Sequence, residues 1–143
     1  MDNFIGQFSH SIDEKGRMAV PAKFKPSLKQ GVVVTRGFDN CLIVYTMPEW
    51  QKEAEKVSAL PMSKKNNRAI ARLKLAGAME VKLDSQGRIL LPDYLRKYAY
   101  LEKKVVVTGL YNHIEIWDEK IWNKYKSNAE KESNKIAEQL ENI

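Results

Sequence analysis

The chain has 143 residues, of which 43% are hydrophobic and 29% are charged. This is the composition of a globular protein with one domain or two small ones. Its one cysteine, Cys41, excludes an internal disulfide and a metal cluster of several cysteines, and it favours a reducing compartment. No apolar run approaches the roughly 18 residues of a membrane span, and the first residues lack the profile of a signal peptide. The sequence therefore predicts a cytoplasmic protein without membrane contact.

The basic residues are unevenly distributed along the chain. Lysine and arginine outnumber aspartate and glutamate by 24 to 18, and the net charge is +5 over residues 1–72 but +1 over residues 73–143. A surface that faces an anionic partner would explain this excess. A charge that only keeps the protein in solution would explain it equally well.

The first half of the chain predicts strands joined by tight turns. Residues 4–12 alternate weakly between apolar and polar side chains, which favours a strand. An Asp-x-x-Gly-Arg turn follows at 13–17, then three apolar residues, and a short helix can begin at Pro21. Two β-rich runs, 32–36 and 41–45, flank a connection whose glycine and asparagine suit positive φ, so they predict a hairpin.

Two helices are expected to close this half. Thr46 and Glu49 have the spacing of a capping box, which predicts that a helix begins there. A second helix over 63–76 would have Ser63 as its N-cap and would end at Gly77.

The second half repeats these elements in the same order. The corresponding elements are a strand over 79–83, an Asp-x-x-Gly-Arg turn at 84–88 and a hairpin of 105–108 with 114–117. The turn lies 71 positions after its first copy, and Trp122 lies 72 positions after Trp50. Because the order is kept and the offset drifts by only a residue or two, we interpret the chain as a tandem duplication. Its units are 1–72 and 73–143, and we expect them to share one core.

The second unit ends with a longer helix than the first. Asp118 takes the N-cap position of Thr46, and apolar residues recur at helical spacing over 119–141. Such a helix would be about 35 Å long at ~1.5 Å per residue, which is more than a compact domain of this size needs. Its end would then either fray or pack on a neighbouring chain.

The duplicated turn is the candidate functional feature. Gly16 and Gly87 can adopt positive φ without strain, so the backbone can reverse direction there. Asp13 and Asp84 can accept hydrogen bonds from backbone amides of the turn and can orient an arginine. An Asp–Arg pair around a glycine is also a common way to hold a hairpin with no ligand at all.

Basic side chains at the turn favour contact with DNA. Arg17 and Arg88 are planar, five-donor groups that suit phosphate oxygens or the O6/N7 edge of guanine. In the first unit Lys15 adds a charge, and three lysines follow in the short helix: Lys23, Lys25 and Lys29. Nothing about folding requires these lysines, and they fit a surface that faces phosphates. The second turn has the neutral pair Ser85-Gln86 instead.

The chain resembles the MraZ family, bacterial transcription regulators of the AbrB/MazE-like superfamily, over essentially its full length. The segments that carry the resemblance are Ile12 to Arg17, Val20 to Phe24, Val34 to Tyr45 and Leu83 to Pro92. The resemblance implies an α+β fold in which two swapped-hairpin (double-split) β-barrel units form a pseudo-dimer with flanking helices. It also implies that several chains assemble into a ring.

The resemblance further implies a function. Family members bind short direct repeats of double-stranded DNA in the promoter of the division and cell-wall gene cluster and usually repress it, which would make this chain a nucleoid-associated repressor. Arg17 and Arg88 would then contact DNA, Asp13 and Asp84 would orient them on the turns of Gly16 and Gly87, and Lys15 and Lys23 would lie at the phosphates. Because it lacks a lysine, the second turn would contribute less phosphate affinity.

Other function classes receive less support. His10 and His113 are isolated, Cys41 lies in an apolar run, and the sequence has no nucleotide-binding glycine loop, so we expect no enzyme, no metal site and no cofactor. An antitoxin-like protein of the same superfamily, which binds a protein partner, is the alternative. Tyrosines near Arg96 and Lys97 could stack on RNA, although tyrosines around a short helix usually lie in a core or an interface.

Overall fold

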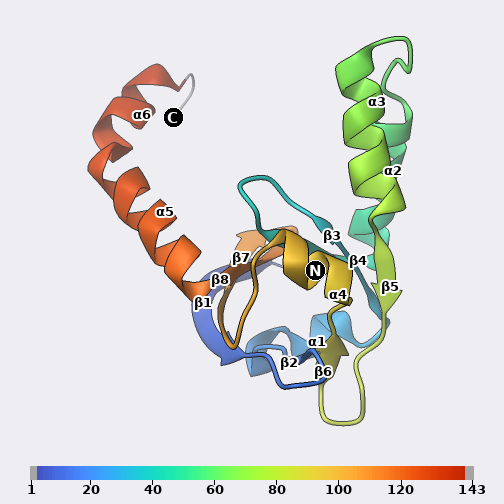
Figure 1. Cartoon of the computed structure of the whole chain (residues 1–143), viewed down its shortest axis with the longest axis vertical. Helices are drawn as coiled ribbons and strands as arrows, with labels where there is room; N and C mark the ends of the chain where they lie inside the picture. Colours follow the sequence, from blue (N-terminus) through green and yellow to red (C-terminus); the bar gives the residue numbers. More distant parts are fainter. Residues whose placement is uncertain (1–2, 141–143) are drawn as a thin grey trace.

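The computed structural model describes residues 3–140 and has an α+β fold with antiparallel strands (Figure 1). The strands are β1 (Phe4–Ser11), β2 (Arg17–Ala19), β3 (Val32–Arg36), β4 (Leu42–Thr46), β5 (Met79–Val81), β6 (Arg88–Leu90), β7 (Lys104–Tyr111) and β8 (Ile114–Asp118). Six of them form one sheet in the order β1-β7-β8-β4-β3-β5, and β2 pairs with β6 in a separate two-stranded ribbon. The mixed fold class and both predicted hairpins are confirmed.

The pairing of the strands exchanges elements between the two units. β1 of the first unit pairs with β7 of the second, while β5 of the second unit pairs with β3 of the first. The two hairpins meet where β4 pairs with β8. If each strand is replaced by its counterpart in the other unit, the order of the sheet is simply reversed. Both units are therefore needed to build the sheet and the ribbon.

The core draws buried side chains from both units. Met18 and Ile89 lie opposite each other in the β2–β6 ribbon, and each is only 1% exposed. Phe24, from the helical turn after Pro21, packs edge-on against Phe4 with ring centroids 5.0 Å apart. The interior of the protein thus lies between the ribbon with its short helices and one face of the sheet.

The helices follow the repeat as well. They are η1 (Ala22–Phe24), α1 (Lys25–Leu28), α2 (Met47–Ser58), α3 (Lys65–Ala71), the π-helical turn η2 (Arg72–Ala76), α4 (Asp93–Tyr98), α5 (Glu119–Lys131) and α6 (Ser133–Gln139). The predicted caps of α2 and α5 are confirmed: Thr46 Oγ1 accepts a hydrogen bond from Glu49 N at 3.4 Å, and Asp118 Oδ2 accepts one from Ile121 N at 3.2 Å. In Figure 1, α2–α3 and α5–α6 project as two arms away from the β2–β6 ribbon.

Three details differ from the sequence-based expectations. Ser63 does not cap the second helix: α3 begins after Lys64, and the carbonyl of Ser63 accepts a hydrogen bond from Arg68 Nη1. The helix expected over 119–141 is interrupted at Glu132, where Ser133 Oγ donates to the carbonyl of Glu130, and residue 141 lies outside the described residues. In the first hairpin, positive φ falls on Asn40, as expected, and on Asp39, but not on the glycine.

Within residues 3–140, no helix combines the length and the apolar character that crossing a bilayer requires.

Candidate nucleic-acid interface

Each Asp-x-x-Gly-Arg segment folds into the same tight turn. In the first copy Gly16 N donates to the carbonyl of Asp13 at 3.0 Å, and in the second Gly87 N donates to the carbonyl of Asp84 at 3.0 Å. Gly16 has φ of +86° and Gly87 has φ of +75°, a region that disfavours residues with a Cβ. The predicted role of glycine in reversing the chain is confirmed at both positions.

The aspartate carboxylates hold each turn together, as predicted. Asp13 Oδ1 accepts hydrogen bonds from the backbone N of Lys15 and of Arg17, both at 2.9 Å. Asp84 Oδ1 accepts from the backbone N of Gln86 and of Arg88 at the same distance. These bonds, above all the one from the arginine backbone, lower the pKa of both aspartates from the usual value, because they stabilise the charged form.

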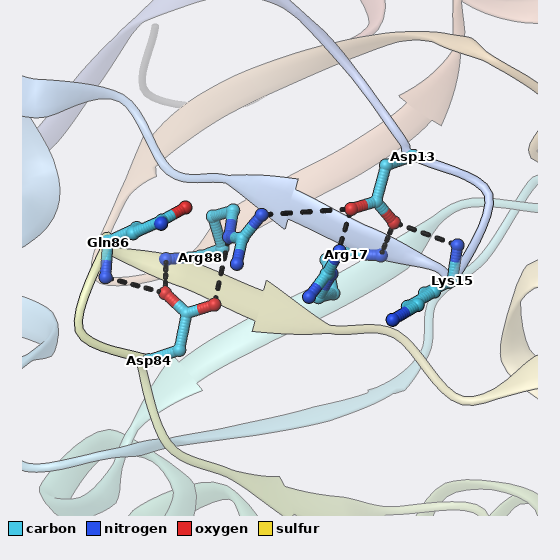
Figure 2. A network of polar contacts seen from close by, with 6 residues as sticks. All are labelled: Asp13, Lys15, Arg17, Asp84, Gln86 and Arg88. Atoms are coloured by element: carbon cyan, nitrogen blue, oxygen red, sulfur yellow. Dashed lines mark hydrogen bonds and ion pairs between the residues drawn. The ribbon is translucent and has the colours of Figure 1, made fainter.

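The second carboxylate oxygen orients the arginine side chain. Arg17 Nε donates to Asp13 Oδ2 at 2.8 Å, and Arg88 Nε donates to Asp84 Oδ2 at 2.9 Å (Figure 2). The side chains of Arg17 and Arg88 are 32% and 26% exposed, so neither side chain is enclosed by the protein.

One ion pair distinguishes the two arginines. Arg88 Nη1 also lies 3.8 Å from Asp13 Oδ2, across the ribbon. Within residues 3–140, neither Nη atom of Arg17 has an acceptor within hydrogen-bond distance. Arg88 is therefore attracted by a second carboxylate, whereas Arg17 is paired only with Asp13 among the described residues.

The ribbon fixes the positions of the two turns. In the antiparallel pair Arg17 lies opposite Leu90 and Arg88 lies opposite Ala19, so the turns extend from opposite ends of the ribbon. Both arginines lie between the two aspartates in Figure 2. The result is a short surface with a guanidinium from each unit and a rigid turn at either end.

Each turn also contacts a basic residue of the other unit, and the sequence did not predict either contact. A Cβ placed on Gly16 would lie 2.8 Å from Cζ of Arg96, and one placed on Gly87 would lie 2.7 Å from Cε of Lys25. Each of these side chains comes from the other unit, and Arg96 follows Lys25 by the same 71 positions that separate the turns. That offset was the signal in the sequence that could have identified them.

The lysines named from the sequence lie at different places. Lys15 is exposed on the first turn. Lys23 is exposed on η1, and within the part of the chain that the structure describes it makes no hydrogen bond or ion pair with either turn. Lys25, two residues later, is the lysine that lies against a turn.

The residues considered for catalysis do not come together. Burial lowers the pKa of both His10 and His113, and burial raises the pKa of the Cys41 thiol well above its usual range. Across residues 3–140, no three acidic, histidine or cysteine side chains are grouped as a metal site would need. The hydroxyls of Tyr94 and Tyr98 donate to the carbonyls of Gly77 and Gly37. These bonds favour packing of the two tyrosines within the chain over stacking on RNA.

The family model described as "MraZ protein, putative antitoxin-like" matches the chain twice, over residues 3–73 and 75–142. The chain belongs to the MraZ family. Proteins named "Transcriptional regulator MraZ" are similar to it over nearly their full length. The one from Natranaerobius thermophilus is 49% identical over 137 residues, 96% of each chain, and the one from Caldanaerobacter subterraneus subsp. tengcongensis is 45% identical over 139 residues, 97% of each chain.

These matches confirm the resemblance and the tandem MraZ repeat. They also place the chain among transcriptional regulators. MraZ proteins are not an enzyme family, so the expectation that the chain is not an enzyme is confirmed.

Proposed function

We propose that this MraZ protein binds double-stranded DNA sequence-specifically and regulates transcription, as a repressor of the division and cell-wall gene cluster, by binding direct repeats in a promoter. The observation that carries the proposal is the pair of partly exposed arginine side chains, each oriented by its own aspartate, on the β2–β6 ribbon. The name of the relatives, transcriptional regulator, supports the same partner.

The chemistry of the ribbon suits a duplex. A two-stranded ribbon is narrow enough to enter a major groove. Because Nε of Arg17 is held by Asp13, its terminal nitrogens are presented in a fixed direction, which reduces the side-chain entropy lost on binding. Two parallel donors in that geometry match the O6/N7 edge of guanine or two phosphate oxygens.

A ring of several chains would supply the affinity that one chain lacks. One chain offers two small basic turns, and a ring would present many such turns at fixed spacing to repeated DNA boxes, so the boxes would bind through effective concentration. If each chain neutralised two or three phosphates, each phosphate would add about 0.9 to the slope of log affinity against log salt. Exposed apolar side chains on the α5–α6 arm support assembly: Tyr125 is 45%, Ile136 45% and Leu140 53% exposed.

The proposal also includes the barrel arrangement, the bounds of the two units and the cellular location. The exchange of β1 and β5 between units supports a swapped-hairpin β-barrel arrangement, and the two family matches support units 1–72 and 73–143. A DNA-binding regulator would be cytoplasmic and associated with the nucleoid.

A gel-shift series tests the function directly. It compares the DNA upstream of this protein's own gene with a scrambled version of the same length, at two salt concentrations, and sedimentation measures the size of the free protein. We expect preferential binding of the natural DNA, a steep loss of affinity at the higher salt, and an oligomer at micromolar concentration. Equal binding of both DNAs would contradict sequence specificity, and a strictly monomeric protein would contradict the ring.

An antitoxin-like role in binding a protein partner is the second candidate. The observation that favours it is the same α5–α6 arm, because all residues of α6 are exposed. Removing the chain from Ser133 onward separates the two functions. If the arm joins copies of this chain, the truncated protein should sediment as smaller species. If the arm binds a different protein, the truncated protein should form the same oligomer as the full chain.

A further inference from the structure

Each end of the β2–β6 ribbon is built from both units. Arg96, on α4 of the second unit, lies against Gly16 of the first turn, and Lys25, at the start of α1 in the first unit, lies against Gly87 of the second turn. The exchange has the same pseudo-symmetry as the pairing of the strands. Neither basic residue belongs to the Asp-x-x-Gly-Arg segment against which it lies.

Arg96 is fixed in place by the backbone that also fixes the first turn. Leu91 N donates to the carbonyl of Gly16 at 2.9 Å, and the carbonyl of Leu91 accepts a hydrogen bond from Arg96 Nε at 2.9 Å. Arg96 Nη2 lies 3.7 Å from Asp93 Oδ1, on a carboxylate that is itself 65% exposed. The guanidinium is thus oriented through Nε, while its terminal nitrogens have, among the described residues, one distant and solvated partner.

Lys25 brings a positive charge to the turn that has no lysine of its own. Its Cδ, Cε and Nζ all lie within 3.1 Å of the position that a Cβ on Gly87 would occupy, so the end of the side chain crosses the glycine. Within residues 3–140, its ammonium has no hydrogen-bond or ion-pair partner. The middle of this turn, Ser85-Gln86, is neutral.

We infer that Lys25 and Arg96 bind DNA phosphates at the two ends of the ribbon, on either side of Arg17 and Arg88. This inference rests on the proposed function and identifies further DNA-binding residues for it. A cation without a partner next to a rigid turn is a favourable site for a phosphate oxygen, and Arg96 has the planar donors for a second one. The second turn is then not deficient in phosphate affinity, because Lys25 supplies the charge that Ser85-Gln86 lacks.

The variants separate the charge from the packing. Lys25→Met keeps a stem of similar length over Gly87 and removes the ammonium. Arg96→Met removes the guanidinium, and Arg96→Lys restores a charge at the same place. Lys56→Met is the matched control, because Lys56 is exposed on α2 in the arm that points away from the ribbon (Figure 1) and its replacement changes the net charge equally.

Affinity is measured for the natural upstream DNA and its scrambled version over a range of salt concentrations, with a thermal unfolding curve for each variant. We expect Lys25→Met and Arg96→Met to weaken binding of both DNAs by a similar factor, about three- to tenfold. The salt slope should fall by ~0.9 for each phosphate that the variant no longer neutralises. The ratio of the two affinities should stay the same, because binding to phosphates carries no sequence information. Arg96→Lys should recover part of the affinity, and Lys56→Met should behave as the unaltered protein.

The outcomes distinguish failure of this inference from failure of the proposed function. If the unaltered protein does not prefer its upstream DNA, the proposed function fails. If it does, but Lys25→Met and Arg96→Met keep the affinity and salt slope of Lys56→Met, the inference is overturned and the function stands. A loss of affinity that follows the unfolding temperature and leaves the salt slope unchanged also overturns it, because the two side chains would then only support the turns.

Discussion

The two ends of the β2–β6 ribbon have the same backbone and different charges. Both turns show the same Asx-type bonds, the same positive φ at glycine and the same Nε–carboxylate pair. The first turn carries Glu14-Lys15 and receives Arg96, whereas the second carries Ser85-Gln86 and receives Lys25. The bonds common to both ends are those that the fold requires. The side chains that differ make none of the hydrogen bonds that the two turns share, so their difference is available for recognition of a partner.

The centre of the ribbon gives the largest expected effect. Met18 and Ile89 lie opposite each other and are equally buried, so Met18→Ala and Ile89→Ala should each lower the free energy of unfolding by about 2–5 kcal/mol. Because the two residues lie in the same cluster, either variant should still unfold in one transition. Urea titration measures this, with tryptophan fluorescence and circular dichroism as the two signals. Two separate transitions would show that the units have independent cores.

Arg17→Ala tests the more available of the two guanidinium groups. A side chain that makes two parallel bonds to a guanine typically contributes about 1–3 kcal/mol of discrimination, so the affinity for the natural DNA should fall by roughly 5- to 150-fold. The fold should be kept, since the side chain is partly exposed. Fluorescence anisotropy with labelled duplex measures the affinity, and a variant that binds as tightly as the unaltered protein would contradict this role.

Arg88→Ala should have the same kind of effect but a smaller one. Arg88 is less exposed than Arg17 and is paired with both Asp84 and Asp13, so its charge is already partly neutralised by the protein. The comparison is made in the same anisotropy titration, with both variants at equal ionic strength. A larger loss of affinity for Arg88→Ala than for Arg17→Ala would show that the second turn, not the first, contributes more to DNA binding.

Local interactions of this fold were predictable from the sequence. The glycine turns, the aspartate hydrogen bonds and the caps at Thr46 and Asp118 each depend on residues within four positions of one another. Their geometry follows from the residue types alone. The tandem repeat was also visible, because it is a property of the sequence itself.

Long-range pairings were not predictable in the same way. The residues suggested no reason for β1 to pair with β7, which is 93 or more positions away along the chain, and only the family resemblance implied an exchange. The sequence indicated that Lys25 faces phosphates, but it did not predict that Lys25 and Arg96 each lie against a turn of the other unit. The expected cap at Ser63 was wrong, because the helix begins only after Lys64. The helix expected over 119–141 is interrupted where Ser133 Oγ donates to the carbonyl of Glu130, a local side-chain bond of the kind that competes with regular helix geometry.

The smallest expected effect concerns the hydrogen-bonded aspartate that both turns have. Hydrogen bonds from the turn lower the pKa of Asp13 and of Asp84 from the usual value of 3.8. A carboxylate whose pKa is lower in the folded state contributes stability above its unfolded pKa, and the contribution is lost as the pH falls through the folded value. The urea midpoint should therefore decrease below about pH 4. Asp13→Asn and Asp84→Asn should each make the urea midpoint less dependent on pH. Both effects should be small and similar, because both carboxylates are solvated. NMR titration of the two carboxyl carbons measures the shifts directly, and an ordinary or raised pKa at either position would show that the two turns are not equivalent in their hydrogen bonding.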